Sequence, residues 1–189
     1  SGRFYTKGRA PMTTAVEFIQ RGLKQLHTSL EKTLGELTPE QLHTVPGGHP
    51  KANTIAWILW HLVRTEDNVV RFVLQNRRPT VWQEGGYAET LGLPPVAQGT
   101  GMPTAEAQAL RLKDLALFRE YAQKAWASTD EYLTATPAAA LEATVTVKPF
   151  GEMQAVQALG YICLTHAMAH AGEIDVSRTL LGLPTAYGA

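Results

Sequence analysis

The residues whose types and spacing could best support chemistry lie in the segment THAMAHAGEI, which contains His166 and His170. Because these histidines are four positions apart, a helix would place both imidazoles on one face, one turn above the other. That geometry supplies two of the three protein ligands that many catalytic metal sites use. The same face passes through Leu159 and Cys163 before the pair and through Glu173 and Ser177 after it. The histidines lie on its apolar stripe, so the rings are expected to point into a core. An unpaired buried polar group costs on the order of 1–3 kcal/mol, so these rings need partners.

A third histidine, His61, occurs in the middle of the segment WILWHLVRTED, one helical turn after Trp57. In a helix bundle, polar side chains from facing helices converge in the core, where metal sites are built. One histidine from this segment and the pair from THAMAHAGEI would give three nitrogen ligands and leave positions open for water or substrate. The spacing of the pair alone is a weak signal, and satisfied core histidines that bind nothing remain an alternative.

The other polar residues near these segments have simpler interpretations. Glu173 is a candidate catalytic residue, because a carboxylate can orient a ligating imidazole, but a surface position explains it equally well. Cys163 is expected to be a buried, inert thiol. His27 has no evident partner and is a weaker ligand candidate. Solvated positions are expected for His43, His49, Glu66 and Asp67.

Four segments with apolar residues at helical spacing predict the helices that would position these side chains. Their approximate ranges are 14–34, 53–75, 104–132 and 152–181. Short Thr-Pro turns are expected at 38–42 and 136–141, and a long irregular stretch at 80–102. The only strand-like alternation, 143–147, is too short to anchor a sheet. The predicted fold class is therefore all-α, a four-helix bundle with a long crossover loop.

Composition limits the classes of partner. The 189 residues suit one domain, expected over residues 13–189, after a disordered or extended N-terminal segment, 1–12. Lys plus Arg and Asp plus Glu both number 17, so no basic excess favours nucleic acid and no polybasic run favours a membrane surface. The apolar runs are too short to span a bilayer. A single cysteine and the lack of a secretory signal predict a cytoplasmic protein.

Several segments resemble the DinB/YfiT-like superfamily of metal-dependent proteins, in a match that extends from about Thr13 to Pro184. LTPEQLHTVPGG and NTIAWILWHLVRTED resemble the family's entry into its second helix. THAMAHAGEI resembles the signature of its fourth helix, and TLLGLP resembles its usual end. The order of these motifs and their placement on helices carry the resemblance.

The resemblance implies a four-helix bundle with a three-histidine divalent metal site, usually Zn or Ni, and often a homodimer. The ligands that it assigns are His61, His166 and His170, all of which are present. Some relatives are thiol-dependent transferases that use bacillithiol, mycothiol or glutathione, and others are described as metal-dependent hydrolases. A low-molecular-weight thiol is therefore a candidate second cofactor, and a small molecule is the expected substrate.

Three hypotheses about function follow. In the first, a metal ion lowers the pKa of a bound water or thiol, which then attacks a small electrophilic substrate, as in an S-transferase or a hydrolase. In the second, the protein is a non-catalytic metal-binding or stress-related bundle. In the third, the histidines are hydrogen-bonded core residues and no metal binds.

Overall fold

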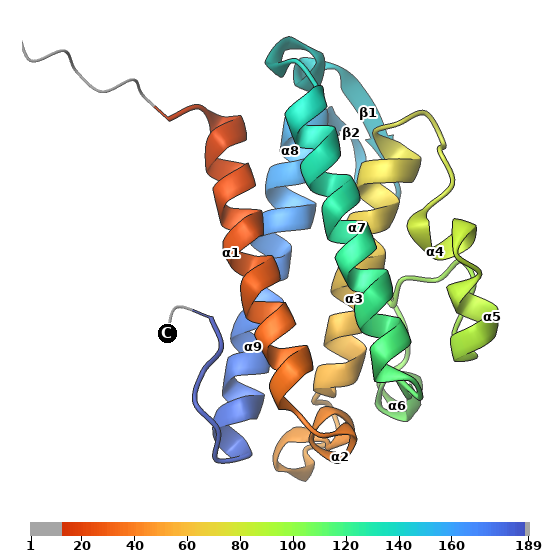
Figure 1. Cartoon of the computed structure of the whole chain (residues 1–189), viewed down its shortest axis with the longest axis vertical. Coiled ribbons are helices and arrows are strands. Elements are labelled where there is room, and N and C mark those ends of the chain that lie inside the picture. Colours follow the sequence, from red (N-terminus) through yellow and green to blue (C-terminus); the bar gives the residue numbers. More distant parts are fainter. Residues whose placement is uncertain (1–12, 188–189) are drawn as a thin grey trace, which may run out of the picture.

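Four long helical rods packed side by side form the body of the computed structural model, which describes residues 13–187 (Figure 1). They are α1 (Ala15–Glu36), α3 (Ile55–Asp67), α7 (Leu115–Ala135) and α9 (His166–Leu180). Two of the rods are extended by π-helical segments, η2 (Asn68–Val73) after α3 and η4 (Ala158–Thr165) before α9. The predicted all-α class is confirmed. The expected N-terminal segment, 1–12, lies outside the described residues.

Short elements connect the rods. They are α2 (Pro39–His43), η1 (Pro46–Gly48), α4 (Val81–Glu84), α5 (Tyr87–Leu91), α6 (Thr104–Ala109), η3 (Ala138–Glu142) and α8 (Ala155–Gln157). A two-stranded antiparallel hairpin joins β1 (Thr144–Val147) to β2 (Gly151–Gln154), with Val147 opposite Gly151. The hairpin projects beside η2, and its turn reaches the side of the bundle where the candidate site lies (Figure 1).

Threonine caps begin three helices as their sequences predict. The Thr14 side chain accepts a hydrogen bond from the Glu17 N–H, and the Glu17 carboxylate accepts one from the Thr14 N–H. Thr38 caps α2 in the same reciprocal manner with Gln41, and the Thr54 side chain accepts a hydrogen bond from the Trp57 N–H at the start of α3. These bonds satisfy N–H groups that a helix start leaves without partners. The start of α3 is therefore fixed, and His61 lies on its second turn.

Three predicted ranges needed correction. The third helix is two helices, because the chain leaves helical geometry after α6 and Asp114 caps α7 by accepting from the Leu117 N–H at 2.9 Å. The fourth begins at Ala155 rather than at Glu152, since residues 152–154 pair in the hairpin. The stretch 80–102, expected to be irregular, contains α4 and α5.

The prediction that Glu66 and Asp67 are solvated was wrong, because both side chains are buried. The Asp67 carboxylate accepts hydrogen bonds from the N–H groups of Val81 and Trp82 at 2.9 and 3.0 Å, and from the Tyr121 hydroxyl at 3.0 Å. It therefore joins the end of α3 to the start of α4 and to the middle of α7. Such burial of a carboxylate requires satisfied oxygens, and these contacts supply them.

Glu66 belongs to a second buried cluster. Its carboxylate lies 2.9 Å from Nε2 of His27 and accepts a hydrogen bond from the Thr129 hydroxyl at 2.6 Å. The His27 ring stacks on Trp126 with ring centroids 5.0 Å apart. His27 therefore has a partner that the sequence did not reveal, and it ties α1 to α3 and α7.

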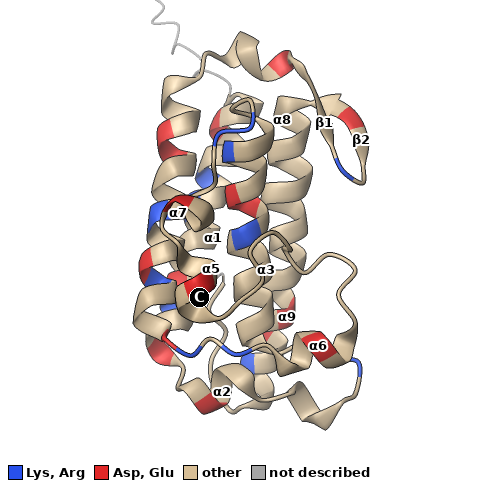
Figure 2. Cartoon of the chain, turned by 90° about the vertical axis from the view of Figure 1, so that its right-hand side faces the viewer, with Lys and Arg blue, Asp and Glu red and all other residues tan. Residues whose placement is uncertain are grey.

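Charged residues are dispersed over the helices, with acidic and basic side chains interspersed (Figure 2). Within residues 13–187, no helix combines the length and apolar character that crossing a bilayer requires.

Candidate metal centre

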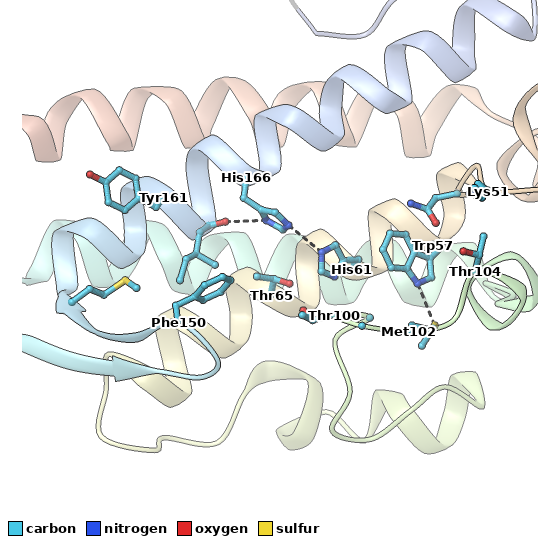
Figure 3. A pocket seen from close by; sticks show the side chains of 15 residues that line it. Lys51, Trp57, His61, Thr65, Thr100, Met102, Thr104, Phe150, Tyr161 and His166 are labelled. Carbon is cyan, nitrogen blue, oxygen red and sulfur yellow. Dashed lines mark hydrogen bonds between the residues drawn. The ribbon is translucent and has the colours of Figure 1, made fainter.

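Three histidines from two rods meet at one point beside the bundle core. His61 comes from α3, and His166 and His170 come from the first two turns of α9. Nε2 of His61 lies 3.2 Å from Nε2 of His166, and one nitrogen from each of the three rings falls within 4.8 Å of the others. The His61 and His166 rings point toward one another (Figure 3). Both candidate segments of the sequence are thus brought together.

Each ring has its outer nitrogen, Nδ1, directed at an oxygen. Nδ1 of His61 faces the backbone carbonyl of Gln98, and Nδ1 of His166 lies 3.2 Å from the carbonyl of Ile162. Nδ1 of His170 lies 3.2 Å from Oε1 of Glu173, close but without the alignment of a full hydrogen bond. Because an oxygen acceptor favours a proton on Nδ1, the carbonyls of Gln98 and Ile162 favour the tautomers of His61 and His166 in which Nε2 is free to accept. Oxygen partners of this kind orient imidazoles for metal binding.

Burial keeps two of the rings neutral. Desolvation lowers the pKa of His61 from 6.5 to about 4, against a smaller effect of the Gln98 carbonyl, which raises it. Desolvation also lowers the pKa of His166. A metal ligand must be the neutral imidazole, so these environments remove competition from protons at neutral pH. The donor set, three imidazole nitrogens with open space beside them, fits a divalent ion such as Zn, Ni, Co or Cu.

The metal-free protein is expected to lose stability as the pH falls from about 6.5 toward 4. The pKa of His61 is lower in the folded state than in the unfolded state, so acid protonates the unfolded state first. The change from 6.5 to about 4 corresponds to about 3 kcal/mol of stability, present above pH 6.5 and fully lost only below pH 4. Urea unfolding at pH 7 and pH 4.5 measures this loss, and His61→Gln should reduce it. An equal loss of unfolding free energy in the parent and in His61→Gln would show that protonation of His61 is not its cause.

The other candidate residues, Glu173, Cys163 and His43, lie outside the three-histidine cluster. Glu173 lies beside His170 with half of its side chain exposed, and this contact is the main cause that lowers the pKa of Glu173. It is placed to orient a ring rather than to reach the cavity. Cys163 is buried outside the histidine cluster, as expected, and burial raises the pKa of its thiol. His43, expected to be solvated, is half-buried and accepts a hydrogen bond from the Leu112 N–H at 2.9 Å.

The long loop at 80–102 closes over His61, a contact that the sequence did not predict. Gly99 adopts a φ of +95°, and a Cβ there would lie 2.9 Å from Trp57 and 3.1 Å from Nδ1 of His61. Only glycine accepts both this conformation and this approach without strain. The segment GTGM was the available signal, since closely spaced glycines mark a backbone that turns tightly or approaches another group. Trp57 completes the enclosure by stacking on His61, with ring centroids 4.8 Å apart.

A cavity of about 620 Å³ adjoins the histidines. Its lining residues are Lys51, Asn53, Trp57, His61, Thr65, Gly99, Thr100, Gly101, Met102, Thr104, Phe150, Met153, Tyr161, Ile162 and His166. They come from the segment before α3, from α3, from the loop before α6 and the start of α6, from the hairpin, from η4 and from the start of α9 (Figure 3). This volume lies within the range of small-molecule sites.

The fold and the three-histidine cluster together define a helical bundle with a candidate metal centre. The chain belongs to the DinB superfamily, whose family model matches residues 23–174. Among solved structures it is similar to a conserved protein from Enterococcus faecalis, with 20% identity and a TM-score of 0.74 over 90% of this chain and 99% of that chain. At this identity the likeness concerns the fold alone. No curated protein matches the chain.

Proposed function

We propose that this protein is a divalent-metal enzyme, with its ion held by the Nε2 atoms of His61, His166 and His170. The observation that carries the proposal is that one nitrogen from each of the three rings falls within 4.8 Å of the others. Nδ1 of His61 and of His166 faces a backbone carbonyl, and Nδ1 of His170 lies beside Glu173. A purely structural cluster would need a proton on Nε2 of His61 or His166 to join the two rings by a hydrogen bond, whereas the backbone carbonyls at both Nδ1 atoms favour the proton there. Membership of the DinB superfamily supports the same assignment.

The proposed reaction is the transfer of a low-molecular-weight thiol to a small electrophilic substrate. When bound, Zn or Ni would act as a Lewis acid and lower the pKa of a coordinated thiol toward neutrality. Hydrolysis is the alternative reaction, and it usually needs a general base within reach of the water. No Asp or Glu is among the residues that line the cavity, all of which lie within 13–187. This favours thiol transfer, in which the ion alone can activate the nucleophile.

The chain's own residues have distinct tasks in this proposal. The Gln98 carbonyl fixes the ring of His61, and Glu173 fixes the ring of His170. Trp57 covers His61 on one side and excludes water from it.

We further propose a single domain over residues 13–189 that works as a cytoplasmic homodimer, in line with the family resemblance. Light scattering of the purified protein tests the dimer.

The proposed function predicts one equivalent of metal and thiol-dependent turnover. Protein purified without a histidine tag is stripped, reloaded with Zn or Ni, and its metal content measured. It is then mixed with glutathione and a chromogenic aryl chloride, whose chloride leaves as the sulfur–carbon bond forms. The loaded protein should accelerate the reaction and the stripped protein should not. If the protein binds one equivalent of metal but does not accelerate the reaction of any of several thiols, the enzyme proposal is wrong. The alternative function, a non-catalytic metal-binding bundle, would then hold.

A further inference from the structure

The cavity beside the histidines has two chemically different ends (Figure 3). Lys51 and Thr104 lie at one end, and Phe150 and Tyr161 lie at the other, with the histidines between them. Lys51 is the only charged residue among the 15 that line it, apart from the histidines, and all 15 lie in the described chain. A divalent ion at the histidines would add to this positive charge. The field in the cavity therefore favours an anionic ligand over a cationic one.

One end of the cavity presents large apolar side chains to solvent. Phe150, from the turn of the hairpin, is 63% exposed, and Tyr161, from η4, is 62% exposed. Met153, from β2, and Ile162, next to Tyr161 in η4, also line the cavity. Large apolar side chains that line a concave surface and stay exposed are typical of a binding site, because a ligand's apolar body would remove them from water.

Thr65 provides a separate, polar observation. It lies one turn after His61 on α3, lines the cavity and is 7% exposed, yet its hydroxyl has no hydrogen-bond partner. Other helical threonines donate to the carbonyl four residues earlier, as Thr28 and Thr165 do. A buried hydroxyl without a partner is uncommon and calls for an explanation. Its place between His61 and Phe150 makes a ligand the natural partner (Figure 3).

We propose that the cavity binds a small amphipathic organic anion. Its anionic head lies between the three histidines and the Thr65 hydroxyl, which donates a hydrogen bond to it. Its apolar body lies against Phe150, Met153, Tyr161 and Ile162. This inference rests on the proposed function, because an ion at the histidines neutralises the head, and it adds the class of ligand, its orientation and a hydrogen-bond donor.

Calorimetric titration of zinc-loaded protein tests the class of ligand. The probes are 4-phenylbutyrate, acetate and 4-phenylbutylamine, and zinc content is measured on the same sample. We expect 4-phenylbutyrate to bind at least tenfold more tightly than acetate, and the amine to show no binding. Phe150→Ala should weaken 4-phenylbutyrate binding at least fivefold without changing zinc content. The matched control is Phe18→Ala, because Phe18 is the same residue type at 68% exposure on α1, outside this cavity, and its loss should change nothing.

Substitution of Thr65 tests the placement of the head. Thr65→Val should weaken both acids about fivefold, and Thr65→Ser should restore most of the affinity. In the metal-free protein, Thr65→Val should not lower the melting temperature, because it removes a hydroxyl that has no partner. A purely structural threonine would show the opposite pattern, with lost stability and unchanged affinity.

The possible failures are distinguishable. Stoichiometric zinc with equal affinity for the acid and the amine would overturn the ligand class and leave the metal assignment intact. Equal affinities of the parent, Thr65→Val and Phe150→Ala for 4-phenylbutyrate would overturn the orientation. Absence of stoichiometric zinc would overturn both the proposed function and this inference.

Discussion

Replacement of His166 by alanine should lower the affinity of the protein for zinc by at least about 100-fold. Loss even of a group that only orients a ligand typically costs 10–100-fold, so loss of a ligand should cost no less. Nε2 of His166 lies 3.2 Å from Nε2 of His61, and no other described histidine, cysteine or acid lies close enough to join the cluster in its place. Competition with a chromophoric chelator measures the affinity.

The matched control for this substitution is His49→Ala. His49 is exposed and outside the cluster, so its loss should leave zinc affinity unchanged. Zinc at 100 times its dissociation constant stabilises the folded state by about 2.7 kcal/mol, and this gain should disappear in His166→Ala. Zinc affinity in His166→Ala equal to that in His49→Ala would exclude the three-histidine assignment.

Replacement of Asp67 by alanine should destabilise the folded protein by roughly 3–5 kcal/mol, the typical cost of leaving a buried charge without its partner. The variant would leave the N–H groups of Val81 and Trp82 without acceptors. It would also leave Arg64, 2% exposed and 3.7 Å from Asp67, without its countercharge. Burial raises the pKa of Asp67, and these contacts act in the opposite direction.

Urea unfolding at pH 7 measures the cost of losing Asp67. The control is Asp130→Ala, which removes an exposed carboxylate from α7 and should change stability by less than about 0.5 kcal/mol. Asp67→Asn should fall between the two, because the amide oxygen can still accept one hydrogen bond but the countercharge to Arg64 is lost. A cost below about 1 kcal/mol for Asp67→Ala would show that the contacts at the end of α3 contribute little to stability.

The four-helix arrangement and the meeting of the three histidines could be predicted because both depend on local patterns. Apolar residues at helical spacing define the rods, and four-residue spacing defines the His166 and His170 face. Facing helices then bring His61 to that face. The prediction required no knowledge of loops, since regular helices carry all three residues.

The partners of these residues could not be predicted, because long-range contacts decide them. Glu66 and Asp67 follow one another at the polar end of an apolar helix, a pattern that is also typical of a solvated face. Their burial depends on His27, 39 residues away, and on Tyr121, 54 residues away. The carbonyl that orients His61 belongs to Gln98, and a backbone group leaves no mark on residue type.

The π-helical segment η4 has a consequence for how this site tolerates change. In it, the N–H of His166 donates to the carbonyl of Tyr161, five residues earlier, so the helix contains a wider turn than an α-helix would. Each residue of an α-helix advances the chain by about 100°. Loss of one residue from 158–165 would be absorbed by a return of the wider turn to α-helical geometry, but insertion of one residue there would turn both downstream imidazoles away from α3, although no ligand had been altered. The number of residues between the buried Leu159 and His166 therefore determines the centre as much as the ring nitrogens do. An increase in that number would disrupt the centre even if no histidine were replaced.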